Sequence, residues 1–366
     1  MIAKRPITIK QVAHEAGVST QTVSRVINNR PDVAPETRQR VLKVIERLGY
    51  QPSALARSLI RRRSHTLGVV IAGLKYTGPS RTLSGITEQA EAMGYSLLLK
   101  ELPEFDSGDV EPILNALLAR QVDGIIWAVS EVGDNRDWLH ERLPDLSVPI
   151  IFLTMGQQAN LPVVAVDNYS GGRMATQHLL EQGYRHIGHI TGPLAWWEAR
   201  QRKAGWQETL VEAGIPVNDH QWVEGNWSSA SGKRAIRQLL EQYPDMDAVF
   251  AGNDQMALSV AQVACRSGLK IPQELAVVGF DGIPEAAYFW PPLSTVEQDM
   301  HQLGCVAVDQ VVRMIEASRE SEHTFEPETI WLKPRLIVRE SSLASAKAVE
   351  VPLGQGSFDP GTSLGL

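Results

Sequence analysis

Two short helices joined by one glycine are predicted by the stretch Thr8-Ile-Lys-Gln-Val-Ala-His-Glu-Ala-Gly-Val-Ser-Thr-Gln-Thr-Val-Ser-Arg-Val-Ile27. Thr8 and Gln11 form a capping box for the first helix, Gly17 ends it, and Ser19 is suited to cap the second. A third helix is predicted over 35–48, where apolar residues recur at helical spacing. Three helices, the first two joined by a glycine turn, follow the helix-turn-helix plan.

Charge is divided unevenly along the chain. The first 65 residues carry thirteen Lys and Arg but four Asp and Glu, a balance of +9, whereas the whole 366-residue chain has a net charge of −7. A basic head on an acidic body is typical of a protein that binds a polyanion with one part only. No apolar run approaches the length of about 18 residues needed to span a membrane, and no secretory signal is evident, so we expect no membrane partner.

The second predicted helix has the residues to read DNA bases. In a helix-turn-helix this helix enters the major groove, and its first turn meets the base edges. Gln21 can pair with adenine, Arg25 with guanine, and Thr20 can offer a methyl or hydroxyl contact. The short polar side chains expected on phosphate oxygens are Thr8, Ser19, Thr22, Ser24 and Asn28.

These motifs, with 41–50 and the run Pro52-Ser-Ala-Leu-Ala-Arg-Ser-Leu59, resemble the lac-repressor (LacI/GalR) family of bacterial transcription regulators over residues 8–340. The resemblance implies that a hinge helix follows the head and that two copies insert a leucine pair into the minor groove. That leucine is Leu59, flanked by Ala56, and it would bend the DNA by unstacking a base step. Arg57 would add a phosphate contact. The resemblance also implies a bacterial cytoplasmic, nucleoid-associated location.

After residue 66, apolar runs alternate with amphipathic segments as far as about residue 339. This α/β alternation, with buried β-branched strands, predicts parallel sheets covered by helices on both faces. The strands exceed what one compact sheet usually holds, so we expect two sheets with a cleft between two lobes. The expected strands are 67–71, 96–99, 124–129, 150–153, 163–166, 187–190, 248–251 and 276–280, and the expected helices include 80–93, 170–182, 198–213, 229–242 and 254–267.

The resemblance implies a body like the type I periplasmic binding proteins, and the pattern gives its bounds. We expect a DNA-binding domain over 1–50, a hinge or linker over 51–65, an effector-binding and dimerisation domain over 66–340, and a disordered tail over 341–366, which is rich in Ala, Ser, Gly and Pro. The tail lacks leucine heptads, so we expect a dimer rather than a tetramer. Lobe one is expected over about 66–166 and 297–326, and lobe two over about 167–296 and 327–340.

No catalytic or metal-binding constellation is found in the body. Ser231-Gly-Lys-Arg234 lacks the glycine and the hydroxyl residue of a phosphate-binding loop. His178, His186 and His189 have no carboxylate or thiol companions at ligand spacing, so packing histidines are expected. We therefore expect no enzyme activity, no cofactor and no metal.

The body does contain residue types that bind sugars. The segment from Gly192 to Trp206 follows a predicted strand, and loops at that edge form the crevice of α/β folds. Tryptophan faces stack on sugar rings, which points to Trp196 and Trp227. The doubled Trp196-Trp197 suggests a ligand as large as a disaccharide.

The resemblance adds further effector residues. Arg202 falls where the family grips effector hydroxyls, Asn253 and Asp281 match polar pocket positions, and Trp227 matches the stacking tryptophan of sugar-sensing members. The turn matched in lobe one contributes Gly78, Ser80 and Thr82. Ala128 and Thr154 stand where the lac repressor has Asn and Asp, so the ligand need not be the same galactoside.

These features together predict a homodimeric repressor that leaves a near-palindromic operator when a neutral mono- or oligosaccharide, of the galactoside or β-glucoside type, closes the cleft. One alternative is a regulator of the same fold that uses a purine or another small metabolite as corepressor. A more remote alternative is a sugar-processing enzyme fused to a DNA-binding head, for which no phosphate or magnesium motif is found.

Overall fold

The computed structural model describes residues 7–50, 63–105, 110–319 and 325–344. The N-terminal part is a three-helix head with its own apolar core, built around Val12, Val23 and Val41. The capping box of Thr8 and Gln11 is formed as predicted. The three helices are α1 (Ile9–Ala16), α2 (Thr20–Ile27) and α3 (Pro35–Leu48).

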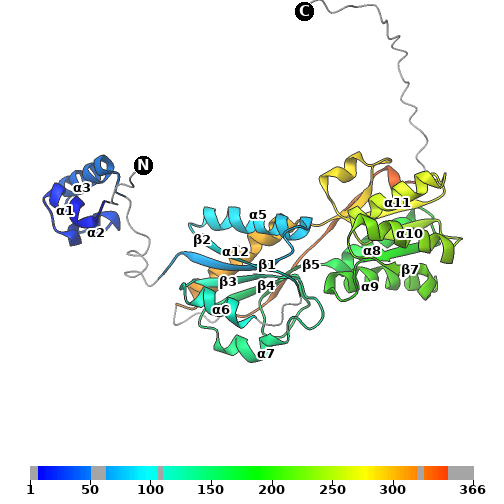
Figure 1. The fold of residues 1–366 in the computed structure, drawn as a ribbon, viewed down its shortest axis with the longest axis horizontal. Coiled ribbons are helices and arrows are strands. Elements are labelled where there is room, and N and C mark those ends of the chain that lie inside the picture. The colour runs from blue at the N-terminus through cyan, green and yellow to red at the C-terminus, as the bar shows by residue number, and fades with distance from the viewer. Residues whose placement is uncertain (1–6, 51–62, 106–109, 320–324, 345–366) are drawn as a thin grey trace, which may run out of the picture.

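Lobe one is a six-stranded, fully parallel sheet in the order β11-β5-β4-β3-β1-β2. The two faces of the sheet supply two separate cores: α5 and α12 cover one face, and α6 and α7 cover the other (Figure 1). The strands are β1 (Thr66–Ala72), β2 (Ser96–Leu102), β3 (Gly124–Ala128), β4 (Ile150–Leu153), β5 (Val163–Val166) and β11 (Thr329–Leu332). The helices are α5 (Thr77–Ala92), α6 (Glu111–Leu118), α7 (Trp138–Arg142) and α12 (Met300–Ala317).

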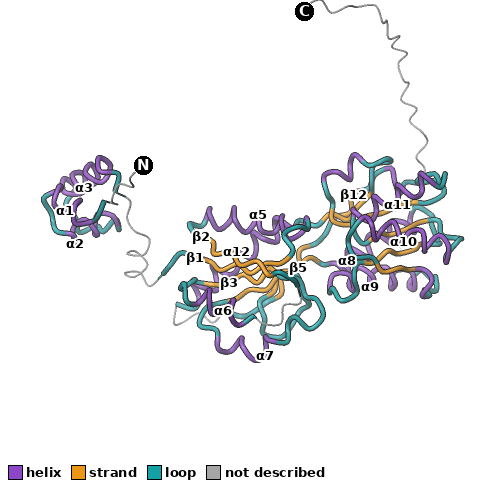
Figure 2. The backbone as a smooth tube through the Cα atoms, in the orientation of Figure 1, coloured by secondary structure: helices purple, strands orange, loops and turns teal. Residues whose placement is uncertain are grey.

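Lobe two repeats this plan in the order β12-β10-β9-β8-β6-β7, and only β12 runs antiparallel to its neighbour. Helices α8 and α9 cover one face and α10 and α11 the other, so strands lie inside and helices outside in both lobes (Figure 2). The strands are β6 (Ile187–Thr191), β7 (Trp222–Glu224), β8 (Ala248–Ala251), β9 (Ala276–Asp281), β10 (Ser294–Glu297) and β12 (Arg335–Ile337). The helices are α8 (Asn168–Glu181), α9 (Trp197–Glu212), α10 (Ser229–Gln242) and α11 (Asp254–Arg266).

The predicted two-sheet α/β fold is thus confirmed. The chain crosses between the lobes three times: after β5, after β10 and between β11 and β12 (Figure 1). The third crossing was predicted near residue 327, which is wrong: β11 pairs with β5 in lobe one, and the chain leaves that lobe only at Lys333-Pro334. A four-residue edge strand with mixed polarity gave no clear sequence signal.

The start of the predicted disordered tail is also corrected. Ser341 and Ser342 are buried in a short helix over Glu340–Ser342. The Ser342 hydroxyl hydrogen-bonds to the His178 ring at 2.7 Å and to the Ser294 hydroxyl at 2.6 Å. Small polar side chains can therefore be structural here because the body provides partners for them. Residues 345–366 lie outside the described residues.

In each lobe, glycines allow a pair of helices to cross in close contact. In lobe one, a Cβ on Gly85 of α5 would lie 2.0 Å from the carbonyl oxygen of His301 in α12. In lobe two, a Cβ on Gly172 of α8 would lie 2.3 Å from the carbonyl oxygen of Arg202 in α9. Glycine lets these backbones approach more closely than any side chain permits.

No helix among the described residues is long and apolar enough to cross a membrane.

Candidate functional site

The head presents an exposed polar row on α2. Thr20, Gln21 and Arg25, the three predicted base-reading residues, all lie on its exposed side. Arg25 has an exposed ion pair with Asp32, with Nη1 3.5 Å from Oδ2. Such a pair is weak in water, so it leaves the guanidinium available for a stronger acceptor.

Several residues predicted to bind phosphate also shape the helices. Thr8 accepts from the Gln11 backbone N–H, and the Ser19 hydroxyl accepts from the Thr22 N–H at 3.0 Å. The Asn28 side chain donates to the Ser24 carbonyl at 2.8 Å. These local bonds fix the ends of α1 and α2. Ala56, Arg57 and Leu59, predicted for the minor groove, lie outside the described residues.

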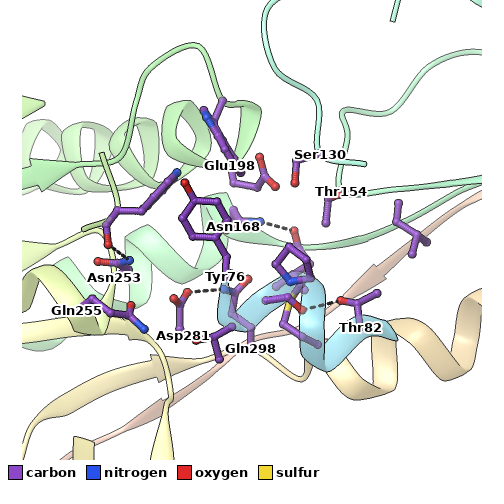
Figure 3. Close-up of a pocket in the computed structure, with 18 of the residues that line it drawn as sticks. Tyr76, Thr82, Ser130, Thr154, Asn168, Glu198, Asn253, Gln255, Asp281 and Gln298 are labelled. Atoms are coloured by element: carbon purple, nitrogen blue, oxygen red, sulfur yellow. Dashed lines mark hydrogen bonds between the residues drawn. The ribbon is translucent and has the colours of Figure 1, made fainter. Parts of the chain in front are cut away.

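A cavity of about 290 Å³ lies between the lobes, at the carboxyl ends of the strands of both sheets (Figure 3). Its lining combines α5 of lobe one with the first turns of α8, α9 and α11 of lobe two. Seven of the eight predicted effector residues line it: Gly78, Thr82, Trp196, Arg202, Trp227, Asn253 and Asp281. The eighth, Ser80, does not, because its hydroxyl points back to donate to the Leu74 carbonyl.

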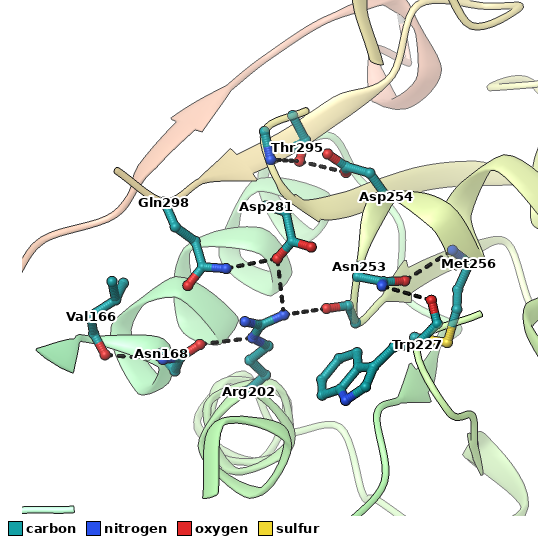
Figure 4. A network of polar contacts seen from close by, with 12 residues as sticks. Val166, Asn168, Arg202, Trp227, Asn253, Asp254, Met256, Asp281, Thr295 and Gln298 are labelled. Carbon is teal, nitrogen blue, oxygen red and sulfur yellow. Dashed lines mark hydrogen bonds and ion pairs between the residues drawn. The ribbon is translucent and has the colours of Figure 1, made fainter. Parts of the chain in front are cut away.

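Arg202 forms the centre of a buried polar network (Figure 4). Its Nε donates to Asn168 Oδ1 at 2.8 Å, and its Nη1 donates to the Gly252 carbonyl at 2.5 Å and lies 3.5 Å from Asp281 Oδ1. The guanidinium carbon lies 3.8 Å from the centre of the Phe280 ring. Arg202 therefore joins the ends of strands β8 and β9 to the start of α8, as well as lining the cavity.

The backbone around this network is held in unusual conformations. Trp227 has φ 69° and Asp281 has φ 106°, both in the left-handed region that non-glycine residues rarely adopt. The Trp227 carbonyl accepts from the Asn253 side chain at 2.9 Å, and Asp281 accepts from Gln298 at 2.7 Å. Strained residues held by such bonds cluster at ligand sites.

Asp254 follows Asn253 at the start of α11 and is expected to make the stability of lobe two depend on pH. Burial, aided by the neighbouring Asp281 carboxylate, raises the pKa of Asp254 to about 7. An unfolded aspartate titrates near pH 4, so between about pH 4 and 7 the folded protein holds a proton that the unfolded chain has lost. We expect the free energy of unfolding to fall as the pH rises through this window. Urea unfolding at pH 5 and pH 8 measures this decrease in the free energy of unfolding, which should be smaller in Asp254→Asn. Equal decreases in the wild type and the variant would contradict the raised pKa of Asp254.

Sequence reasoning missed several polar residues that line the cavity, including five from lobe two and the cleft edge of lobe one. All five follow the carboxyl end of a strand within seven residues, which is the signal that could have found them. Asn168 and Gln298 bond to Arg202 and Asp281 respectively. Glu198 extends toward Ser130 of the other lobe (Figure 3), and burial raises the pKa of its carboxyl group. The five are Ser130, Asn168, Glu198, Gln255 and Gln298.

Aromatic rings from both lobes meet at the cavity. The Trp196 ring lies edge-on to Trp227 with centroids 5.9 Å apart, and edge-on to Tyr76 of lobe one at 6.4 Å. Trp197 differs from the prediction, because it is buried in a core of lobe one and stacks on Trp331 at 6.0 Å. The doubled tryptophan therefore supplies one ring to the ligand cavity, and its argument for a disaccharide is lost.

Two of the histidines singled out in the sequence are packing residues. His189 is fully buried, stacked on Phe250 at 4.6 Å, and burial lowers its pKa to about 3. His178 bonds to Ser342 in the interior. Among the described residues, no group of three or more His, Cys, Asp or Glu side chains could hold a metal ion.

Comparison with known proteins agrees with this architecture. Residues 8–53 match the family model described as bacterial regulatory proteins, lacI family, and residues 176–342 match a periplasmic binding protein-like domain. The ribose operon repressor of Escherichia coli (strain K12) is 34% identical over 92% of this chain and 99% of its own length. The transcriptional repressor PurR of Haemophilus influenzae (strain PittEE) is 33% identical over 91% and 98%.

Solved structures of other proteins have the same architecture. A lac repressor dimer bound to operator and the anti-inducer ONPF superposes with a TM-score of 0.82 and 30% identity, covering 93% of this chain and all of that one. The relatives from Escherichia coli and Haemophilus influenzae are both named as repressors. The chain therefore belongs to the lacI family of bacterial regulatory proteins and is a DNA-binding transcriptional regulator.

Proposed function

We propose that this regulator is a homodimeric, cytoplasmic repressor that leaves a near-palindromic operator when a neutral sugar enters the cavity between its lobes. The head supplies base reading through Thr20, Gln21 and Arg25, and the residues of the hinge, Ala56, Arg57 and Leu59, supply the minor-groove contact. The cavity supplies the switch, because a ligand that touches both lobes changes how they sit relative to each other.

The observation that carries the sugar assignment is a set of buried polar atoms around one cavity. Glu198 Oε2, Gln255 Oε1 and Trp227 Nε1 have no hydrogen-bond partner among the described residues. A buried polar atom left in this state costs about 1–3 kcal/mol, so a ligand that bonds to it gains that amount. Two acceptors and one donor suit hydroxyl groups, which can both donate and accept.

The charges of the cavity favour a neutral ligand. Its charged lining residues are Lys75, Glu198, Arg202 and Asp281, two of each sign. Arg202 already pairs with Asp281, and the Lys75 ammonium lies 5.3 Å from the centre of the Tyr76 ring. This leaves no cluster of free basic groups, which a phosphate or nucleotide would need. Trp196 and Trp227 provide apolar faces for a sugar ring.

An operator mobility-shift titration tests the effector assignment. A palindromic operator, bound by the full-length protein, is titrated with lactose, cellobiose, methyl β-D-galactoside, methyl β-D-glucoside, hypoxanthine and guanine. We expect at least one sugar to release the DNA and the two purines to have no effect. If a purine strengthens binding and no sugar acts, the corepressor alternative is correct.

Base reading is tested on the same operator. We expect Gln21→Ala and Arg25→Ala each to cost about 1–3 kcal/mol, roughly 5- to 150-fold in affinity, and to relax the preference at one base pair of each half-site. Arg237→Ala, an exposed arginine on α10 of the body, is the control for the lost charge and should bind normally. Uniform weakening on every sequence would mean phosphate contacts instead.

We propose that an exposed pair of aromatic residues in lobe two forms part of the contact between the two copies of the dimer. Tyr288 and Trp290 are each 89% exposed, on a segment fixed by the Ile283 N–H donating to Asp254 at 2.9 Å. Exposed aromatic residues of this kind are enriched at interfaces and suit a two-fold contact between copies. We expect Tyr288→Ser and Trp290→Ser each to raise the dimer dissociation constant about tenfold or more, measured by sedimentation. Val211→Ser, at an exposed apolar residue of α9, is the control; an unchanged dimer in all three would place the contact elsewhere.

A further inference from the structure

The first turn of α9, in lobe two, is hydrogen-bonded to a loop of lobe one. The Trp197 N–H donates to the Glu131 carbonyl at 3.0 Å, and the Gly133 N–H donates to the Ala195 carbonyl at 3.0 Å. Between them, Val132 and Trp196 form an isolated antiparallel bridge. Three consecutive residues of each lobe thus pair across the cleft like two short strands.

The Glu131 carboxylate connects the same two segments. Its Oε2 accepts from the Gly156 N–H of lobe one at 2.9 Å, and its Oε1 accepts from Arg200 Nη2 of α9 at 3.1 Å. The Glu131 side chain is only 18% exposed, so its pairing is less screened than that of a surface ion pair. One partly buried carboxylate is therefore shared between the lobes.

Trp197 adds an apolar anchor. It belongs to a helix of lobe two, yet it is 7% exposed and packs into a core of lobe one that includes Phe152 and Met155. Its ring also stacks on Trp331 of strand β11. Separating the lobes here would expose this large ring to water, at an apolar cost of roughly 25 cal/mol per Å².

These contacts between the two lobes lie next to residues that line the cavity. The residue after Trp197 is Glu198, which extends toward Ser130 (Figure 3), and one turn further along α9 is Arg202. We infer that Glu131 and Trp197 are positioning residues: they dock the first turn of α9 onto lobe one, hold this edge of the cleft shut without any ligand, and so preset Glu198 and Arg202. Only this last consequence rests on the proposed function.

Hydrogen exchange on the full-length protein, with no sugar and no DNA added, tests the docking directly. Trp197 is the first residue of α9, so its N–H has no acceptor within the helix. Its protection, like that of the Gly133 N–H, can come only from the other lobe. We expect both amides to exchange about 100-fold or more slowly than exposed loop amides in the wild type.

Variants separate docking from general stability. We expect Glu131→Ala and Trp197→Ala to speed exchange at Gly133 about tenfold or more, with Trp197→Phe restoring much of the protection. Glu212→Ala, which removes the ion pair of Arg173 within lobe two, is the matched control and should leave Gly133 unchanged. Amides of β1 and β8 report whether each lobe stays folded.

The inference is overturned if the wild-type Trp197 and Gly133 amides exchange as fast as those of open loops. It is equally overturned if Glu131→Ala affects Gly133 no more than Glu212→Ala does. Neither result would bear on whether a sugar is the effector, because no sugar enters the experiment. Conversely, an effector that proves to be a purine leaves the docking intact.

Discussion

Arg202→Ala is expected to abolish the response to the effector and to lower the free energy of unfolding of the body by about 3–5 kcal/mol, the usual cost of breaking a buried ion pair from one side. The substitution leaves Asp281, Asn168 and the Gly252 carbonyl without the donor they share. Operator binding by the variant should persist at a low temperature, at which its body stays folded, because the head has its own core. Urea unfolding and the operator titration measure the two effects.

Matched variants separate the loss of a buried charge from the loss of an arginine. Arg173→Ala removes a partly exposed arginine, paired with Glu212 across α8 and α9, and should change the stability little. The double variant Arg202→Ala with Asp281→Asn should be less damaged than the two single effects added together, because no unpaired charge remains. Equal stabilities of Arg202→Ala and Arg173→Ala would show that the network around Arg202 contributes nothing to the fold.

Gly85→Val is expected to destabilise lobe one by about 3 kcal/mol or more, at the upper end of overpacking effects. A Cβ at this position would lie 2.0 Å from the His301 carbonyl oxygen, and backbone cannot rotate away as a side chain can. Helix α12 would be pushed off α5, which withdraws Leu303 and Ala307 from the core. Thermal unfolding checks the effect.

Gly78→Ala provides the control within the same helix. The nearest atom to a Cβ at Gly78 is the terminal methyl of Met300 at 3.6 Å, an ordinary contact. Replacing a helical glycine by alanine then favours the helix by up to about 1 kcal/mol. A loss of stability at Gly78 equal to that at Gly85 would mean that helix crossing is not the cause.

The sequence predicted the elements whose signals are local. Capping residues such as Thr8 and Ser19 indicated the helices of the head, and runs of β-branched residues indicated the strands buried on both faces, such as β4 and β5. Short edge strands such as β11 and β12 escaped, because only their neighbours determine that they pair. The long helix α12 was not among those named in advance, although its apolar spacing is regular.

Site residues within family motifs could be predicted from the sequence, whereas residues that only the fold brings to the cavity could not. Arg202, Asn253 and Asp281 were identified from short family motifs, and they meet at one cavity. Glu198 and Gln255 came next to predicted residues but were passed over, since burial without a partner cannot be read from sequence. Trp197 misled because its neighbour Trp196, the extended N-cap of α9, lines the cavity, whereas Trp197 is the first residue of the helix and enters a core of lobe one.

The three crossings between the lobes also govern the order in which the protein can be completed during synthesis. The core of the head is complete once Tyr50 is made, since among the described residues no member of this core lies further along the chain. Lobe one, by contrast, lacks its edge strand until Leu332 has been added, and lobe two lacks β12 until Ile337. A chain that ends early in the body therefore has a complete DNA-binding head but an incomplete body. Both sheets of the body stay unfinished until the last two strands, β11 and β12, have been made.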